Sequence, residues 1–233
     1  MTNQEKGVKV ALISADLGRF RGNPGAGHVQ QELPAGWIAD SFFLDDESYP
    51  ARPSLSPRLQ AKIPKMLGYE MIPGYDYYIW LDSSFSLADP GAVAWLVQAC
   101  AGRDMAVFKH PHRGSIREEL EYIVEAMSAG DRYLSERYQK EPLREQVDLY
   151  LADPAFRDDA LYAMGAFVYS KEMLARPEKN VMPLWYYHNA RYSIQDQLSF
   201  PYLAAGVAGN GFRLATFDAG IFDNRYIAFR AGS

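Results

Sequence analysis

The chain of 233 residues has a single cysteine, Cys100, and little that could serve as a membrane-spanning segment. One thiol cannot form an internal disulfide, and its place in the apolar segment 92–100 is typical of a packed core residue. The apolar stretch near the N-terminus, residues 8–14, is too short for the core of a signal peptide or for a membrane span. We therefore expect a cytoplasmic protein without a membrane span.

The chain also lacks an excess of positive charge. Its 24 lysines and arginines are outnumbered by 29 acidic residues, so the net charge is −5 and nucleic acid is not an expected partner. Local groups of basic residues can still bind a small phosphorylated ligand. Repeats, low-complexity tracts and linkers are absent from the sequence, and 48% of its residues are hydrophobic. These features favour one domain over residues 1–233.

Short apolar segments alternate with segments of helical periodicity. Strands are predicted at 8–14, 39–44, 77–81, 105–109, 163–169 and 214–218, and helices at 58–69, 89–100, 115–151 and 194–205. The third of these helices is expected to break near Gly130. Asp89 and Ser115 are expected to cap two helices, with Glu118 at the capping-box position of the second. The alternation predicts an α/β fold, with a mainly parallel sheet flanked by helices.

The segment 62–87 is the most informative part of the chain. Its apolar strand 77–81 is followed directly by Asp82, and an unpaired charge inside a sheet is costly. Asp82 is therefore expected at the carboxyl end of the strand, where open α/β sheets bind their ligands. There it could hold a divalent cation against a diphosphate, or simply form a turn. Lys62 and Lys65 share a helix face and could neutralise phosphates, although exposed lysines often only solvate a helix.

The segment 109–113, Lys-His-Pro-His-Arg, places four potential cations within five residues. His110 and His112 alternate as on one strand face, so they are a candidate metal pair; a hydrogen-bonding loop is the alternative. Arg113 suits bidentate binding of a carboxylate or phosphate, with Glu118 and Glu119 as structural partners.

Gln195, Asp196 and Gln197 begin a predicted helix. Their carboxylate and amide ends could bind the vicinal hydroxyls of a sugar, although Asp196 could also be a first-turn residue that the helix dipole favours. Gly165, within a predicted strand, would allow a ligand to approach the backbone closely or would serve packing alone. The aromatic segment 184–187 could stack on a sugar or a base, or belong to the core.

The order of these motifs resembles a glycosyltransferase-like family catalogued as a domain of unknown function, whose members include plant proteins linked to mucilage polysaccharide synthesis. The family's motifs appear here as Lys62 and Lys65, IPGYDYYIWLD ending at Asp82, HPHR at 110–113 with Glu119, LYAMG ending at Gly165, LWYY at 184–187 and QDQLSF at 195–200. The resemblance covers about residues 40 to 203.

That family is similar to GT-A-fold nucleotide-diphospho-sugar transferases such as glycogenin. The resemblance implies a Rossmann-like mixed sheet, a nucleotide-sugar donor and an Asp-x-Asp motif that binds Mn²⁺ or Mg²⁺. In this chain the motif reads Asp82-Ser83-Ser84, so the metal ligands would be Asp82 and Ser84. A second strong ligand is left open among Asp218, Asp223, His110 and His188.

The resulting hypothesis is a hexosyl- or pentosyltransferase of polysaccharide biosynthesis, which moves a sugar from a nucleotide-diphosphate donor to a hydroxyl of a glycan or small molecule. Asp82 and Asp196 are the candidate catalytic residues, with the metal on Asp82 stabilising the leaving group. The candidate donor-binding residues are Ser14, Ala15, Asp16, Asp45, Lys62, Lys65, Ser83, Ser84, Arg113, Gly165, Gln195 and Gln197.

Two other classes of function are compatible with the same residues. One alternative is a metal-assisted amide or ester hydrolase that uses His110, His112 and a carboxylate; some relatives in the family are associated with lipid hydrolysis. The other is a non-catalytic module that binds a nucleotide or a sugar, which the serine at position 84 makes plausible.

Overall fold

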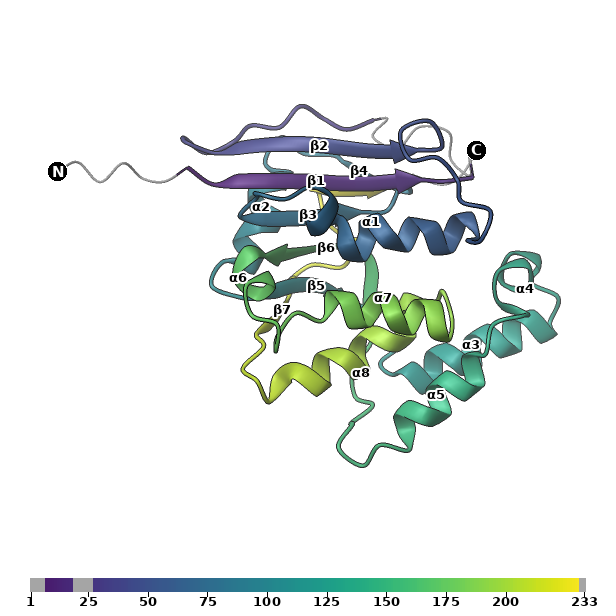
Figure 1. Ribbon diagram of the computed structural model, residues 1–233. Coiled ribbons are helices and arrows are strands. Elements are labelled where there is room, and N and C mark those ends of the chain that lie inside the picture. Colours follow the sequence, from purple (N-terminus) through teal and green to yellow (C-terminus); the bar gives the residue numbers. More distant parts are fainter. Residues whose placement is uncertain (1–6, 19–26, 231–233) are drawn as a thin grey trace.

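A six-stranded mixed sheet forms the centre of the computed structural model, which describes residues 7–18 and 27–230 (Figure 1). The strands lie in the order β2-β1-β3-β6-β5-β7. Their bounds are β1 Lys9–Asp16, β2 Ile38–Asp45, β3 Tyr77–Leu81, β5 Met105–Lys109, β6 Tyr162–Ser170 and β7 Leu214–Thr216. Only β6 runs antiparallel to its two neighbours. The predicted α/β class, with a mainly parallel sheet flanked by helices, is confirmed.

Helices cover both faces of this sheet. Their bounds are α1 Pro57–Met71, α2 Ala92–Cys100, α3 Ile116–Ser128, α4 Arg132–Tyr138, α5 Leu143–Leu151, α6 Lys171–Leu174, α7 Met182–Arg191 and α8 Asp196–Ala208. Alternate side chains of β3 point to opposite faces, as a pleated strand requires. Tyr78 and Trp80 pack in the core under α1, α7 and α8, whereas Ile79 and Leu81 pack against α2. No helix in the described ranges has the length and apolar character needed to cross a bilayer.

Helix α1 lies close against β1, and this contact orients the lysines that the sequence singles out. Ser56 caps the helix by accepting a hydrogen bond from the Leu59 backbone N–H at 3.2 Å, and Pro57 occupies the first turn. Near its other end Gly68 touches β1, since a Cβ there would stand 2.7 Å from Cδ1 of Ile13. The helix therefore presents one long face to the carboxyl ends of β1 and β3.

The structure differs from the sequence-based expectation in its smaller elements. Strands β4 Phe85–Leu87 and β8 Ile227–Phe229 form a separate antiparallel pair, and three residues each are too few for a recognisable periodicity. The helical stretch 115–151 breaks near Gly130 as predicted, but a second break after Tyr138 divides it into three helices, and α7 was not anticipated. Ser115 caps α3 as predicted. Helix α2, however, begins after Gly91, and the Asp89 carboxylate instead accepts the Gly91 N–H at 2.8 Å in the preceding turn.

Candidate functional site

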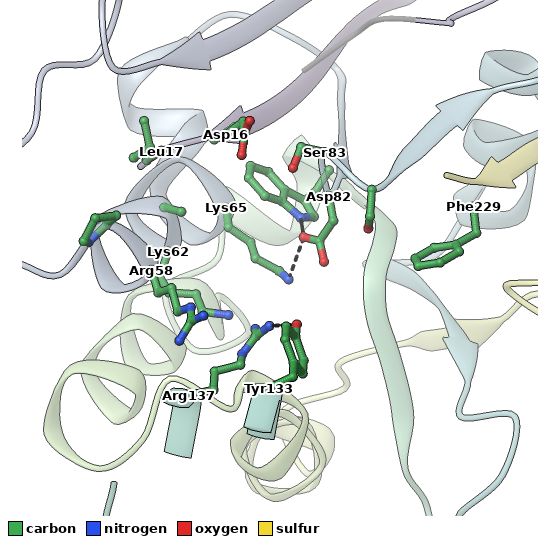
Figure 2. Close-up of a pocket in the computed structure, with 15 residues that line it drawn as sticks. Asp16, Leu17, Arg58, Lys62, Lys65, Asp82, Ser83, Tyr133, Arg137 and Phe229 are labelled. Atoms are coloured by element: carbon green, nitrogen blue, oxygen red, sulfur yellow. Dashed lines mark hydrogen bonds and ion pairs between the residues drawn. The ribbon is translucent and has the colours of Figure 1, made fainter. Parts of the chain in front are cut away.

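A cavity of about 440 Å³ opens where β1 and β3 end (Figure 2). It lies between the N-terminal half of α1, helix α4 and strand β8. Its lining comprises Ala15, Asp16, Leu17, Pro57, Arg58, Ala61, Lys62, Lys65, Trp80, Asp82, Ser83, Ser84, Tyr133, Arg137 and Phe229. Seven of the predicted site residues are therefore brought together here: Ala15, Asp16, Lys62, Lys65, Asp82, Ser83 and Ser84.

Asp82 is the carboxylate that the local structure fixes most firmly. It follows the last residue of β3, and its backbone N–H donates to the Gly165 carbonyl at 2.7 Å. Its Oδ1 atom accepts hydrogen bonds from Trp80 Nε1 at 2.6 Å and from Lys65 Nζ at 3.2 Å. The side chain is still 40% exposed, so the carboxylate is held in one orientation while it faces the cavity.

Lys62 and Lys65 line the cavity and are largely buried, rather than lying on an open helix face. Their Nζ atoms stand 2.6 Å and 2.7 Å from the same oxygen, Oδ2 of Asp196 at the start of α8. The side chains of these lysines and of Asp196 are at most 10% exposed. Asp196 itself does not line the cavity, but it fixes both ammonium groups that do.

The electrostatics of this cluster follow from burial and charge pairing. Burial lowers the pKa of Lys62 to about 8, although the attraction of Asp196 offsets part of the effect. Burial also acts on Lys65, but Asp196 and Asp82 together outweigh it and raise the pKa of Lys65. Burial by itself would raise the pKa of Asp196, yet the two ammonium groups hold it well below its usual range. At neutral pH the cluster thus contains two ammonium groups and an ionised Asp196.

Two arginines complete the cationic lining, and sequence reasoning had missed both. Arg58 lies one turn before Lys62 on α1, and Arg137 projects from α4 on the other side of the cavity (Figure 2). The Arg137 guanidinium donates to the Tyr133 hydroxyl and lies 5.4 Å from the ring centroids of Tyr133 and Tyr138. Within the described chain, its buried Nε atom has no hydrogen-bond partner.

A second polar network lies beside the cavity. Glu119, which is only 3% exposed, accepts hydrogen bonds from Arg113 and, at 2.7 Å, from Gln195 Nε2. Gln195 Oε1 accepts from the Tyr138 hydroxyl at 3.1 Å, and Gln195 Nε2 lies 3.5 Å from Gln197 Oε1. Arg113, Gln195 and Gln197 therefore contact other protein groups and do not line the cavity.

The predicted histidine pair forms a hydrogen-bonded loop. Nδ1 of His110 accepts the backbone N–H groups of His112 and Arg113 at 3.3 Å and 3.0 Å, and its Nε2 lies 3.3 Å from the Arg113 guanidinium. Burial, and then the charges of Arg113 and His112, lower the pKa of His110 to about 4. Both ring nitrogens are thus engaged within the loop. Across the described ranges, no three His, Cys, Asp or Glu side chains gather as a metal site would require.

Three further predicted residues lie close to the cavity without lining it. Ser14 is buried in β1. Asp45 ends β2 and accepts hydrogen bonds from the backbone N–H groups of Glu47 and Ser48, so it organises a turn. Gly165 lies against the site, because a Cβ there would stand 3.5 Å from Asp82 Oδ2.

The donor set around Asp82 does not suit a divalent cation. One of its oxygens already accepts two hydrogen bonds, of which one comes from the Lys65 ammonium group at 3.2 Å. The other carboxylate nearby, Asp196, is shared by both lysines. The third position of the motif is Ser84, a neutral and weaker ligand.

The class of protein is that of a glycosyltransferase-like domain, because a family model of that description matches residues 51–229. The chain belongs to this family, TOD1/MUCI70, as the resemblance in the sequence had indicated. Sequences of curated proteins give no match.

Two solved structures of glycosyltransferases are similar to the chain. One, involved in glycosylation of the major capsid of PBCV-1, has 9% identity and a TM-score of 0.44, and the match covers 96% of this chain and 93% of that one. The other, mouse xyloside xylosyltransferase 1 in its apo form, has 10% identity and a TM-score of 0.48, and the match covers 91% of this chain and 86% of that one.

Proposed function

We propose that this protein transfers a sugar from a nucleotide-diphosphate donor to a hydroxyl group of a glycan or small molecule. The observation that carries the proposal is the cavity at the carboxyl edge of the sheet, which four cationic side chains line together with Asp82. Its volume of about 440 Å³ is in the range of small-molecule sites. The chain's membership of a glycosyltransferase-like family supports the same reaction class. The sequence-based expectation places this reaction in the cytoplasm, in polysaccharide biosynthesis.

The cationic side of the cavity suits the diphosphate of the donor. Arg58, Lys62, Lys65 and Arg137 would contact its oxygens, while the nucleoside lies toward the end of β1 at Ala15 and Asp16. The donor sugar would then lie near Asp82, Ser83 and Ser84, whose polar atoms can bind its hydroxyl groups.

In the reaction, the bond between the anomeric carbon and the diphosphate oxygen breaks and the acceptor oxygen bonds to that carbon. The electron pair of the broken bond leaves with the nucleoside diphosphate, and the acceptor hydroxyl releases its proton to solvent water. Negative charge therefore develops on the leaving oxygen, next to ammonium and guanidinium groups that are already in place. Fixed charges of this kind stabilise a transition state because they need not reorganise when the charge forms.

Asp82 contributes through its position. Trp80 and Lys65 hold Oδ1, so the other oxygen, Oδ2, is left to accept a hydrogen bond from a hydroxyl of the donor sugar. A sugar anchored in this way keeps its anomeric carbon in line with the diphosphate, which is a large part of catalysis in group transfer.

The proposal is tested by incubating the full chain with a panel of nucleotide sugars and measuring release of nucleoside diphosphate and transfer of the sugar. Asp82→Asn should abolish turnover while the variant remains folded, as its circular dichroism spectrum would show. Asp89→Asn is the matched control, because that carboxylate lies in the turn before α2 and should leave turnover unchanged. If the native chain binds a nucleotide sugar but never turns it over, it is a binding module and the proposal fails.

A further inference from the structure

Three of the four cations in the cavity lie on one stripe of α1. Arg58, Lys62 and Lys65 are four and three residues apart, which places them on the same helix face. Arg137 reaches the cavity from α4, opposite that stripe (Figure 2). The four side chains together therefore form a clamp, which we name the cationic clamp, with members on two sides of the cavity.

The cationic clamp is held in place before any ligand arrives. Asp196 Oδ2 accepts from both lysines, and Asp82 Oδ1 accepts from Lys65 as well. These lysines are at most 10% exposed, so water does not solvate their charges freely. An anion that enters the cavity meets positive groups whose loss of water and side-chain freedom has already occurred during folding.

The same arrangement opposes a divalent cation. A metal ion bound to Asp82 would lie within a few ångströms of the buried Lys65 ammonium group, and the two positive charges would repel each other. Among the described residues that line the cavity, the carboxylates are Asp16 and Asp82, and the Asp82 oxygen nearest Lys65 already accepts two hydrogen bonds. Asp196 cannot replace them without releasing both lysines.

We propose that the cationic clamp takes the place of Mn²⁺ or Mg²⁺, so that this protein binds the diphosphate of its donor without any divalent cation. The inference rests on the proposed function for the identity of the ligand, and it replaces the metal that the sequence resemblance implies. Asp196 is then a positioning residue for the cationic clamp, and Arg137 is the member that contacts the phosphate from α4.

The Nε atom of Arg137 adds an independent observation. It is buried and, in the described part of the chain, lacks a hydrogen-bond partner, which is unusual for a charged donor in a folded protein. A phosphate oxygen in the cavity would provide the missing acceptor. The guanidinium is otherwise held by the Tyr133 hydroxyl and by the rings of Tyr133 and Tyr138.

The experiment measures binding of UDP, GDP, ADP and CDP to the full chain by calorimetry, once with EDTA and once with Mn²⁺ or Mg²⁺. We expect at least one nucleoside diphosphate to bind with EDTA, with an affinity within about twofold of that with metal. Binding that appears only with metal, or that metal strengthens by more than about tenfold, would overturn the inference. So would the failure of all four diphosphates to bind.

Variants locate the binding in the cationic clamp. Arg137→Met should lower the affinity for the diphosphate by about tenfold or more in EDTA, because it removes a charge-assisted contact. Lys65→Met should do the same, and Arg137→Met remains informative if the loss of a buried lysine impairs folding. Lys140→Met, on an exposed residue just beyond α4, is the control and should bind like the native chain. If Arg137→Met binds the diphosphate with the affinity of the native chain, the proposed role of the cationic clamp is contradicted.

The outcomes also separate this inference from the proposed function. If the chain binds a diphosphate in EDTA but turns over no nucleotide sugar, the metal-free cationic clamp is supported and the proposed transferase activity is contradicted. If the chain transfers sugar only when Mn²⁺ or Mg²⁺ is present, the transferase activity is supported and the metal-free cationic clamp is contradicted.

Discussion

Lys65 of α1 and Asp196 of α8 meet beneath the cavity, with Nζ and Oδ2 2.7 Å apart and side chains only 4% and 7% exposed. A buried ion pair of this kind is seldom a net source of stability, because both charges lose their hydration. Its presence is better explained by function: Asp196 fixes the position of two ammonium groups that face the cavity.

The first prediction concerns the removal of that carboxylate. Asp196→Asn leaves two buried ammonium groups without their shared counter-charge, and we expect the free energy of unfolding to fall by about 3–5 kcal/mol. Urea denaturation followed by circular dichroism measures the change. Adding Lys62→Met should restore part of the loss, because one of the unpaired charges is then gone.

The control for this prediction is Glu136→Gln, which breaks the surface pair of Arg132 and Glu136. The side chains of that pair are 89% and 56% exposed, so its loss should not change the denaturation curve measurably. An Asp196→Asn variant as stable as the native chain would mean that the lysines do not depend on this carboxylate.

The second prediction is a pH dependence of donor binding. Burial lowers the pKa of Lys62 to about 8, so its positive charge is present below that pH and is lost as the pH rises through it. The affinity for a nucleotide sugar, whose diphosphate is esterified at both ends and keeps its charge, should therefore fall between about pH 7 and about pH 10. Titration calorimetry in matched buffers measures the fall.

Lys62→Met supplies the comparison for the pH effect. The variant should bind weakly at every pH in that range and show no transition near pH 8, while Lys65, whose pKa is raised, keeps its charge. An affinity of the native chain that is constant across the range would show that Lys62 does not contact the phosphate.

Much of this site could be predicted from local pattern alone. The apolar strand before Asp82 predicted a carboxylate at the edge of the sheet, and the spacing of Lys62 and Lys65 placed them on one helix face. Arg58 follows the same helical spacing, so a signal for it was present. Arg137 had no such signal, because its place depends on how the short helix α4 packs beside the sheet.

The role of Asp196 also depends on tertiary structure. Its first-turn position on α8 was expected, but its pairing with two lysines from α1 joins segments that no sequence spacing relates. Likewise, β4 and β8 are three residues each and owe their existence to pairing with one another rather than to a local pattern. Phe229, which lines the cavity, lies on β8 and is therefore placed by that pairing.

The third prediction concerns Gly165. A Cβ at this position would stand 2.7 Å from Cε2 of Phe85, so Gly165→Ala forces that ring to move beside Asp82. We expect a loss of about 1–3 kcal/mol in unfolding free energy, as for other overpacked cores, together with a fall in turnover. Gly206→Ala on α8 is the control: nothing lies within 4 Å of its added Cβ, and alanine favours a helix. Equal stability of the two variants would contradict the predicted clash.

The last prediction separates a structural role for Arg113 from contact with the donor. Glu119 accepts hydrogen bonds from Arg113 and Gln195 while almost fully buried, and Glu119→Gln turns one of its acceptor oxygens into a donor. We expect about 1.5–3 kcal/mol of lost stability, the usual value of a hydrogen bond to a charged group. Glu121→Gln, exposed on the same helix, should be neutral.

The affinity of the Glu119→Gln variant for a nucleoside diphosphate is the second measurement. Neither Arg113 nor Glu119 lines the cavity, so binding to the folded variant should remain within about twofold of the native value. A stable variant that binds the diphosphate at least about tenfold more weakly would instead place the Arg113 guanidinium on the donor. The cationic lining would then extend beyond α1 and α4 to the loop that follows β5.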